Sequence, residues 1–320
     1  GLKPWDISRD EPYFGFSIPG FPKKYFYVWL DAPIGYIAVL DNFLSENSSS
    51  ISAEKLWNES EIYHFIGKDI MNFHTLFWPA LLDASDFKKP SNVFVHGFMT
   101  LNGKKMSKSK GNFLLIDDYL KLLNPDYMRY FLATKLSNGI DDLDLDLLDF
   151  QKKVNTDLVG KFVNIASRSQ GFLKEFNNIL SNDLDEDLID EFSNKKNEIF
   201  NHYLDRNYSK ALKEIMTLAD KANQYIDSNK PWILNKESNN KEKVRKIAST
   251  AINLFKILNL YLEPVIPETS EKIKKYLKCN DNVDNVSSYL KNHEIDSFNP
   301  LILRIEDVEI EKLMEISKNG

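Results

Sequence analysis

The chain has 320 residues, a length that usually holds about two domains, and its formal net charge is −6. With 42% hydrophobic and 12% aromatic residues it can build a buried core, which excludes a wholly disordered chain. The negative balance excludes a bulk basic field for nucleic acid, so any contact with RNA must come from local patches.

The first third of the chain alternates between strand-like and helix-like segments. Proline and glycine interrupt residues 1–20, which we expect to be irregular. Runs of aromatic and β-branched residues predict three strands buried on both faces, at residues 25–30, 62–66 and 93–95. Helical stretches lie between them, at about residues 33–45 and 69–82. This strand–helix–strand order predicts a parallel sheet with right-handed crossovers.

Residues suited to ligand contacts follow each predicted strand directly. They are Asp31 and Pro33, then Gly67 and Asp69, then His96 and Gly97. In open α/β sheets ligands bind at the carboxyl ends of the strands, so we expect the chemistry at this edge. Asp69 also opens the second helix, where an N-cap and a ligand contact both remain open.

The predicted helix at residues 69–82 has two faces that differ in character. Apolar residues at three- and four-residue steps predict its core face, formed by Ile70, Phe73, Phe77 and Leu81. His74 and Trp78 are four residues apart and share a neighbouring face. Taken alone, this pair is typical of ordinary packing.

Lysine gathers in residues 104–112, directly after the turn signal Asn102-Gly103. The lysines are Lys104, Lys105, Lys108 and Lys110. Ammonium groups on flexible stems suit a polyphosphate whose charge must be neutralised as it leaves. A solvated basic loop and a localisation patch remain open as alternatives.

Residues 117–135 again show a helical pattern, and an acidic segment follows. Its carboxylates are Asp141, Asp142, Asp144, Asp146 and Asp149. Their spacing lacks the glycine of a calcium-binding loop, so we interpret the segment as a solvated joint.

From residue 150 onward helical periods dominate and strand signals vanish. Predicted core positions step by four residues through Phe150, Val154, Leu158, Phe162 and Ala166. Further helices are predicted at residues 186–203, 209–228, 241–262 and 268–277. The pattern predicts a bundle of antiparallel helices.

Cysteine, histidine and apolar runs limit the sites and compartments that the chain allows. Cys279 is the only cysteine, which excludes an internal disulfide and suits a reducing compartment, so we expect a cytoplasmic protein. The chain has neither His-x-x-x-His nor Cys-x-x-Cys spacing, and we predict no metal site. No apolar run approaches ~18 residues, so no membrane span is predicted.

Short motifs in a fixed order extend over nearly the whole chain and are densest before residue 112. The lysine run contains Lys105-Met106-Ser107-Lys108-Ser109. The other motifs are residues 5–10, 12–15, 27–36, 65–69, 95–97, 163–168 and 230–232. The lysine run resembles the phosphate-binding signature loop (KMSKS) of class I aminoacyl-tRNA synthetases, and the whole set resembles the methionyl-tRNA synthetases.

The resemblance implies an α/β plus all-α protein. Residues 1–20 would end a connective insertion, and residues 21–112 would form the second half of a Rossmann-like parallel-sheet catalytic domain with the signature loop. Residues 113–150 would connect the domains and contact the tRNA stem. Residues 151–320 would form an α-helical anticodon-binding bundle.

The same resemblance implies three groups of site residues. Methionine would bind among Trp29, Pro33, Tyr36, His74 and Trp78. ATP would bind at Gly67, Asp69, His96, Met99, Lys105, Met106, Ser107, Lys108 and Ser109, with Lys105 and Lys108 catalytic. The anticodon would contact Asn164, Arg168, Pro231 and Trp232.

The chemistry of these residues agrees with the implied ligands. A thioether packs favourably on aromatic rings, and Tyr36 is a polar handle that would separate methionine from leucine. The amide, guanidinium and indole of the anticodon group suit base-edge hydrogen bonding and stacking.

The sequence departs from the family in two respects. It has no His-x-Gly-His motif, and residues 64–67 match that motif only in part. It also lacks the zinc-bearing cysteine cluster of the family. We therefore expect the chain to be a piece that begins inside the connective insertion. Zinc is expected only in the part before it, and a homodimer only in the full-length protein.

The implied activity is that of a methionine–tRNA ligase. Methionine reacts with ATP, used with Mg²⁺, to give methionyl-adenylate, and the methionyl group passes to tRNA(Met) for protein synthesis. We expect this chain alone to be inactive. Two alternatives stay open: a synthetase for another apolar amino acid, and a tRNA-binding module without catalysis.

Overall fold

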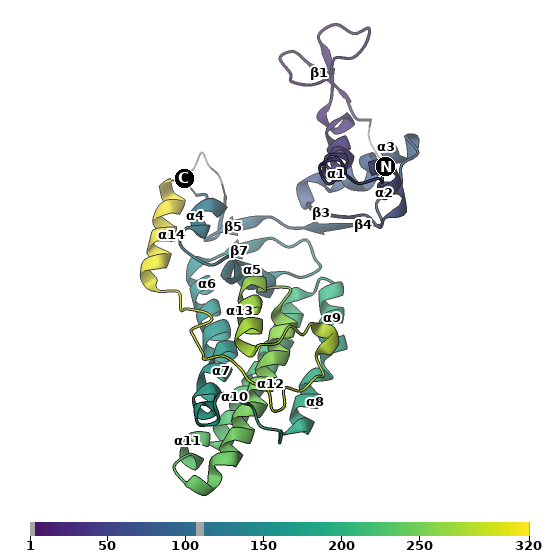
Figure 1. Cartoon of the computed structure of the whole chain (residues 1–320). Helices are drawn as coiled ribbons and strands as arrows, with labels where there is room; N and C mark the ends of the chain where they lie inside the picture. The colour runs from purple at the N-terminus through teal and green to yellow at the C-terminus, as the bar shows by residue number, and fades with distance from the viewer. Residues whose placement is uncertain (1–3, 107–111, 320) are drawn as a thin grey trace. The chain divides into compact units, whose positions relative to one another are not determined.

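The computed structural model describes residues 4–106 and 112–319, which fold as two compact units (Figure 1). The first unit comprises Gly1–Phe98 with Gly139–Asp141, and the second comprises Met99–Asn138 with Asp142–Gly320. None of the described helices is both long and apolar enough to cross a membrane.

The strands of the first unit form two separate pairs. β1 (Ser8–Asp10) and β2 (Lys24–Phe26) are antiparallel, whereas β3 (Tyr63–Gly67) and β4 (Asn92–His96) are parallel. The strands predicted at residues 62–66 and 93–95 are thus confirmed in position, and their register places Gly67 opposite His96. Their predicted burial on both faces is wrong, because Tyr63 and Phe65 on one face of β3 are exposed and β4 has no fully buried residue.

The strand predicted at residues 25–30 is wrong in its extent and its pairing. β2 ends at Phe26 and pairs with β1, and Val28–Leu30 is a 3₁₀ turn. A run of aromatic and β-branched residues indicates half-buried surface but does not say which backbone supplies the hydrogen bonds. Here Ile7, just before β1, accepts the hydrogen bond from the Tyr27 amide, and the chain then turns.

Helices of the first unit follow the predicted order, with one addition. α1 (Gly35–Glu46) confirms the first predicted helix, and the short α2 (Ala53–Glu59) was not predicted. The segment predicted at residues 69–82 contains a π-helical turn, Phe73–Phe77, that continues into α3 (Trp78–Ala84).

The predicted core face of this last segment is wrong. The buried residues are His74, Trp78 and Leu82, with exposed fractions of 1–3%, whereas the four apolar residues of the predicted face are only half-buried. A π turn adds a residue to one helical turn and so rotates the face that follows. His74 and Trp78, which the sequence placed beside the core face, therefore form the buried face of the helix.

The second unit begins with a three-stranded sheet. Its middle strand, β5 (Met99–Leu101), pairs antiparallel with β6 (Lys104–Lys105) and parallel with β7 (Leu143–Leu145). Asn102 and Gly103 between β5 and β6 have φ angles of 49° and 75°. Two successive left-handed residues make the tight hairpin turn that this dipeptide predicts.

The acidic segment is not the solvated joint that we predicted. Asp144 lies in β7 and accepts hydrogen bonds from the Thr100 hydroxyl at 2.6 Å and the Gly103 amide at 2.8 Å. Asp146 caps the next helix by accepting from the Leu148 and Asp149 amides. Carboxylates in such a segment are ligands for backbone amides, which charge patterning alone does not reveal.

Helices make up most of the rest of the second unit (Figure 1). They are α4 (Ile116–Leu120), α5 (Pro125–Lys135), α6 (Leu147–Val154), α7 (Asn164–Ser169), α8 (Glu186–Ser193), α9 (Lys196–Leu204), α10 (Tyr208–Asn229), α11 (Pro231–Leu234), α12 (Lys241–Leu262), α13 (Pro267–Leu277) and α14 (Asp307–Asn319). A π-helical stretch, Asn155–Val163, joins α6 to α7. The predicted helices at residues 209–228, 241–262 and 268–277 are confirmed to within a residue, whereas the one at 186–203 is two helices.

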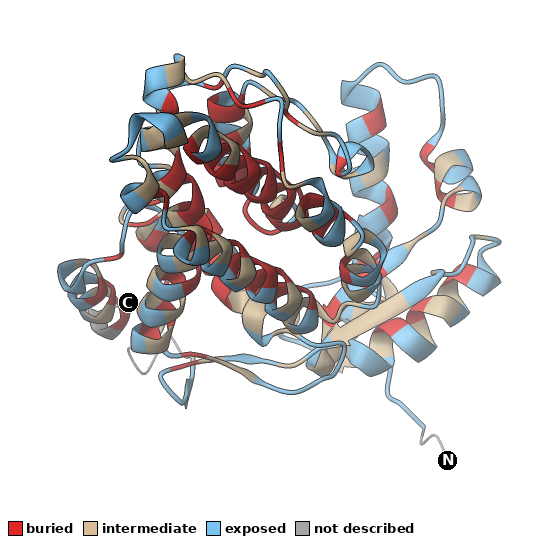
Figure 2. Cartoon of the chain, turned by 90° about the horizontal axis from the view of Figure 1, so that it is seen from below, coloured by how far each residue is buried: buried red, intermediate tan, exposed pale blue. Residues whose placement is uncertain are grey.

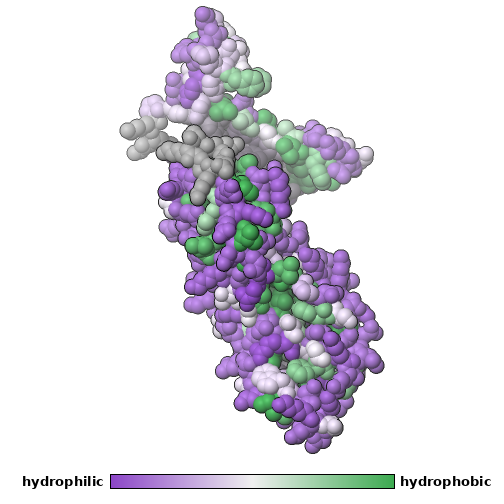
Figure 3. Space-filling view, turned by 90° about the vertical axis from the view of Figure 1, so that its left-hand side faces the viewer, coloured by the Kyte–Doolittle hydropathy of each residue, from purple (hydrophilic) through white to green (hydrophobic). Residues whose placement is uncertain are grey.

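The core of the second unit lies around α12, which packs beside α10 and α7. In Figure 2 the buried residues concentrate on these central helices. All five predicted core positions from Phe150 to Ala166 are fully buried. In the view of Figure 3 the outer surface of the helices is mostly hydrophilic, with small apolar patches.

Candidate functional site

An open cavity of about 470 Å³ lies at the start of α1 in the first unit. Its lining includes Trp29 and two residues from the turn that opens the helix, Pro33 and Tyr36. Pro33 is buried, and its fixed φ sets the course of the chain into α1. Three of the five residues implied for methionine therefore share one cavity.

Aromatic rings form the wall behind Trp29. Phe73 stacks on Trp29 with ring centroids 4.3 Å apart and planes 1° from parallel, and His74 meets Trp29 edge-on at 5.2 Å. Such contacts add about 0.5–1.5 kcal/mol each beyond burial and fix the ring orientation. Phe73 was predicted only as core, and its place on the π turn brings it to Trp29.

A hydrogen-bond chain fixes the polar end of the cavity. The Tyr36 hydroxyl lies 2.8 Å from His74 Nε2, and His74 Nδ1 lies 3.1 Å from the Ile70 carbonyl oxygen. Because the carbonyl can only accept, Nδ1 carries the proton and Nε2 accepts from Tyr36. Burial raises the pKa of Tyr36, so its hydroxyl remains protonated and donates.

Trp78 is almost fully buried and lies behind the cavity rather than on its surface. Its indole N–H donates to His64 Nε2 at 3.2 Å, and the His64 ring lies 4.8 Å from that of Tyr36. The pKa of His64 is lowered by burial and by the neighbouring His74. The sequence identifies His64 only as part of an incomplete motif, and its burial becomes evident only from the structure of β3.

The carboxyl ends of β3 and β4 bring together three of the residues implied for ATP, namely Gly67, Asp69 and His96. Gly67 pairs with His96 in the strand register, and Asp69 follows one residue after Lys68. A Cβ on Gly67 would lie 2.7 Å from Asp69 Oδ1, so only glycine lets this carboxylate approach the backbone. The first unit thus collects polar groups at the sheet edge, as the strand order predicts.

In the second unit the lysine segment begins in β6, the second strand of the β5–β6 hairpin. Lys105 pairs with Thr100 across the two strands, and Met106 packs against the helical core. Asn112 donates to the Lys104 and Lys105 carbonyls at 3.3 and 3.4 Å and so ties the two ends of the segment together. Ser107, Lys108 and Ser109 lie outside the described residues.

Asp144 is a residue of this region that the sequence reasoning missed. It clamps Thr100 and Gly103 at the base of the hairpin that carries Lys105. Met99, another residue implied for ATP, lies in the same sheet, opposite Leu143. Asp144 therefore holds the base of the hairpin that contains Lys105 by two hydrogen bonds.

The residues implied for the anticodon come together at one end of α10. The Arg168 guanidinium lies 5.5 Å from the Trp232 ring, and the Asn164 side-chain amide donates to Asn223 at 3.1 Å. Arg168 also forms an ion pair with Asp227. Asn223 and Asp227, one turn apart on α10, are further residues that the sequence reasoning missed.

Trp232 remains accessible in this cluster, with 43% of its surface exposed, while the preceding Pro231 is buried. Pro231 takes the first position of α11, where its missing N–H costs nothing. An exposed indole beside a fixed guanidinium is a stacking platform for an unpaired base.

Metal-ligating side chains do not cluster in the described part of the chain. No three His, Cys, Asp or Glu residues come close enough there to share an ion.

Two family models match the chain. One, described as tRNA synthetases class I (M), covers residues 1–170, and one described as the anticodon binding domain of methionyl tRNA ligase covers residues 179–314. The chain is 50% identical to the methionine–tRNA ligase of Vesicomyosocius okutanii subsp. Calyptogena okutanii (strain HA), over 99% of this chain and 59% of that protein.

Solved structures show the same likeness. The Mycobacterium tuberculosis methionyl-tRNA synthetase in complex with methionyl-adenylate is 28% identical with a TM-score of 0.81, covering 94% of this chain and 60% of that one. A second structure of that protein bound by methionyl-adenylate has a TM-score of 0.79 at 27% identity, covering 93% and 59%. The chain thus spans about three fifths of the length of these relatives.

The parallel strand pair, the lysine-bearing hairpin and the helical bundle define a class I aminoacyl-tRNA synthetase fold, which confirms the predicted α/β plus all-α class. Both halves of the chain match models of the methionine branch of that class. The chain belongs to the methionyl-tRNA synthetase family, as its motifs had indicated.

Proposed function

We propose that this chain is the larger part of a methionine–tRNA ligase. In the proposed reaction a methionine carboxylate oxygen attacks the α-phosphorus of ATP, and the bond to the β-phosphate oxygen breaks. Methionyl-adenylate forms and pyrophosphate leaves. A hydroxyl of the terminal ribose of tRNA(Met) then attacks the methionyl carbonyl carbon, the bond to the adenylate oxygen breaks, and AMP leaves.

The assignment of methionine as the amino acid rests on one observation, the hydrogen bond between Tyr36 and His74 at the polar end of the aromatic cavity. The Tyr36 hydroxyl, held by His74, stands among rings that suit a polarisable sulfur. The hydroxyl donates its hydrogen bond to His74, so its part is to hold the Tyr36 ring in place for contact with the sulfur, which favours a thioether over a hydrocarbon of similar size. This supports methionine over leucine, isoleucine or valine.

On the ATP side, the proposal assigns the ribose to Gly67 and Asp69, and the adenine to His96 and Met99. Lys105 and Lys108 would neutralise the departing pyrophosphate, supported by Met106, Ser107 and Ser109 in the same loop. ATP would enter as its Mg²⁺ complex. Zinc, which the resemblance implies for a different part of the family, has no fitting donor set among the described residues, and we assign it no step.

The helical unit would read the anticodon through Asn164, Arg168, Pro231 and Trp232. The proposal also includes the domain boundaries at residues 20, 112 and 150, which separate the end of the insertion, the catalytic half-domain, the connecting region and the anticodon-binding bundle. We also place the reaction in the cytoplasm, where tRNA charging supplies translation, and leave any homodimer to the full-length protein.

Amino-acid-dependent pyrophosphate exchange by the full-length protein tests the assignment. Exchange should depend on methionine and be weak with leucine, isoleucine or valine. Tyr36→Phe should narrow the preference for methionine over leucine by about tenfold, because the aromatic ring is then no longer held in place by His74. Tyr63→Phe is the matched control, since Tyr63 is exposed on β3 and bonds Glu61. Exchange driven equally by leucine would reject the methionine assignment.

A second candidate is a tRNA-binding module without catalysis of its own. It is favoured by the span of the chain, about three fifths of the length of its relatives, together with the match of residues 179–314 to the anticodon-binding model. Exchange activity measured on this chain alone separates the two, because a pure binding module would bind tRNA and show none.

A further inference from the structure

A second cavity, of about 570 Å³, lies in the helical unit between α5, the stretch that joins α6 to α7, and α10. Its charged lining consists of four lysines, Lys153, Lys161, Lys210 and Lys213, and two aspartates, Asp157 and Asp220. Two positive charges are therefore left over at this place, although the whole chain is negative. The proposed function assigns no role to this cavity.

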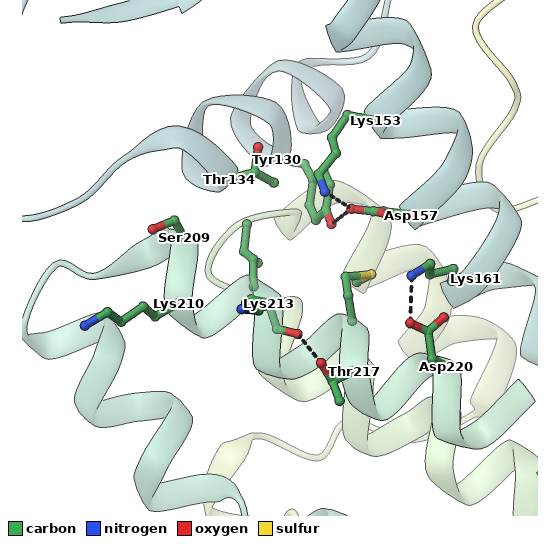
Figure 4. Close-up of a pocket in the computed structure, with 12 residues that line it drawn as sticks. Tyr130, Thr134, Lys153, Asp157, Lys161, Ser209, Lys210, Lys213, Thr217 and Asp220 are labelled. Carbon is green, nitrogen blue, oxygen red and sulfur yellow. Dashed lines mark hydrogen bonds and ion pairs between the residues drawn. The ribbon is translucent and has the colours of Figure 1, made fainter. Parts of the chain in front are cut away.

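The two aspartates hold two of the lysines in place. Asp157, only 4% exposed, accepts from the Tyr130 hydroxyl at 2.8 Å and pairs with Lys153 at 2.9 Å. Lys161 pairs with Asp220 at 2.7 Å. Figure 4 shows Lys153 and Tyr130 both pointing at Asp157, and Lys161 pointing at Asp220. Each ammonium has three N–H donors, so these pairs fix its position and leave donors over.

The other two lysines carry the uncompensated charge. Lys210 and Lys213 are exposed on α10, and neither has an ion pair among the described residues. Thr134, Ser209 and Thr217 also line the cavity, and the Thr134 and Thr217 hydroxyls donate to the Phe131 and Lys213 carbonyl oxygens. Exposed ammonium groups beside two that are held in place are suited to phosphodiester oxygens.

The cavity continues the line of contacts that leads to the anticodon cluster. Three cross-contacts follow one another between the α6–α7 segment and α10: Lys161–Asp220, Asn164–Asn223 and Arg168–Asp227. From Asp227 to Lys213 the helix rises ~20 Å at 1.5 Å per residue. A nucleic-acid strand carries a phosphate about every 3.4 Å along a duplex axis, so this distance spans roughly six nucleotides.

We propose that this lysine cavity binds the phosphate backbone of the anticodon stem, a few nucleotides from the bases read at Trp232. The inference rests on the proposed anticodon role of Trp232 and names a second contact on the same RNA. Backbone contacts of this kind position the RNA and add affinity without reading its sequence. An acidic protein needs such a local patch, because its overall field repels RNA.

The test measures binding of a fluorescent anticodon stem-loop RNA to this chain over ~50–200 mM salt. Lys210→Gln with Lys213→Gln should weaken binding by about tenfold and lower the slope of log affinity against log salt by about two, since each lost phosphate contact lowers it by about one. These positions are exposed and unpaired, so the fold should be retained. Lys275→Gln with Lys312→Gln, two exposed lysines on α13 and α14, removes the same charge and should leave the slope unchanged.

Two results would overturn the inference. One is equal affinity and slope for the cavity variant and the control variant. The other is that inorganic pyrophosphate binds the wild-type chain and not the cavity variant while RNA binding is unchanged, which would make the cavity a site for free anions.

A stem-loop with an altered anticodon separates this inference from the proposed function. If the wild-type chain binds both stem-loops equally, the anticodon assignment fails, and the slope of the cavity variant still decides the lysine cavity. If the chain prefers the methionine anticodon, that preference should be the same in the cavity variant.

Discussion

The aromatic cavity of the first unit and the core of the helical unit are built in opposite ways. In the helical unit the large side chains are fully buried and repeat with the helical period, as Phe162 and Phe255 do. In the first unit the rings of Trp29 and Tyr36 stay partly accessible and are fixed by stacking and by one hydrogen-bond chain. A core maximises burial, whereas a binding site must keep some apolar surface open and hold it rigid by other means.

The largest effect that we expect comes from the helical core. Phe162→Ala should lower the free energy of unfolding by about 3–5 kcal/mol, because it leaves a cavity beside Phe255, whose ring centroid is 4.8 Å away. Urea denaturation followed by circular dichroism measures it. Phe16→Ala is the control, since Phe16 is 69% exposed, and should change stability by less than about 0.5 kcal/mol. Equal losses would contradict the contrast between the two regions.

The next effect concerns catalysis, which the proposed function assigns to the lysine segment. Lys108→Ala in the full-length protein should lower the rate of pyrophosphate exchange by about 10²–10³, the usual loss when a charge-stabilising group is removed, with little change in KM for methionine. Lys104→Ala removes an equal charge from the same segment and should have a much smaller effect. A rise in KM for methionine equal to the fall in rate would reject the transition-state role of Lys108.

A smaller effect should separate the anticodon cluster from the aromatic cavity. Trp232→Ala should lower kcat/KM for tRNA charging by about 5- to 150-fold, since stacking on one base contributes ~1–3 kcal/mol. Adenylate formation should be unchanged. Ile233→Ala, at a neighbouring exposed position, is the control for the helix itself. Unchanged charging by the tryptophan variant would remove Trp232 from the anticodon site.

The smallest effect is a pH dependence confined to the first unit. The pKa of His64 is lowered in the folded chain, so below its ordinary value of about 6.5 the unfolded chain takes up the proton first. Its contribution to stability is therefore complete above about pH 6.5 and is lost as the pH falls through the folded pKa. Protonation also removes the acceptor for the Trp78 indole.

Urea midpoints followed by tryptophan fluorescence between about pH 5 and 8 measure this dependence. His64→Gln should flatten the curve, whereas His202→Gln, a substitution on α9 in the helical unit, should leave it as in the wild type. A steeper fall in the His64 variant would contradict the assignment.

Regular patterns were predicted well because each position is decided by its neighbours in sequence. The four-residue steps from Phe150 to Ala166 are fully buried, and the strand at residues 62–66 places Gly67 at the sheet edge beside His96. The Asn102-Gly103 turn formed as predicted, since few other residues accept two successive left-handed conformations.

The failures share a cause, which is that a distant partner or one extra residue changed the outcome. The strand predicted at residues 25–30 ends at Phe26 and pairs with β1 instead of joining the parallel sheet. The π turn at Phe73–Phe77 exchanged the two faces of its helix, which turned His74 and Trp78 inward. Asp144 and Asp146 accept hydrogen bonds from backbone amides, whereas the sequence predicted that they would be solvated.

The family and the helical bundle could be predicted from the sequence, because motifs and periods are local properties of the chain. The folded chain was needed to show that His64 bonds Trp78, that Asp144 bonds Thr100, and that Asp227 pairs with Arg168. These partners are far apart in sequence, and the geometry of a hydrogen bond between them depends on how whole helices and strands pack.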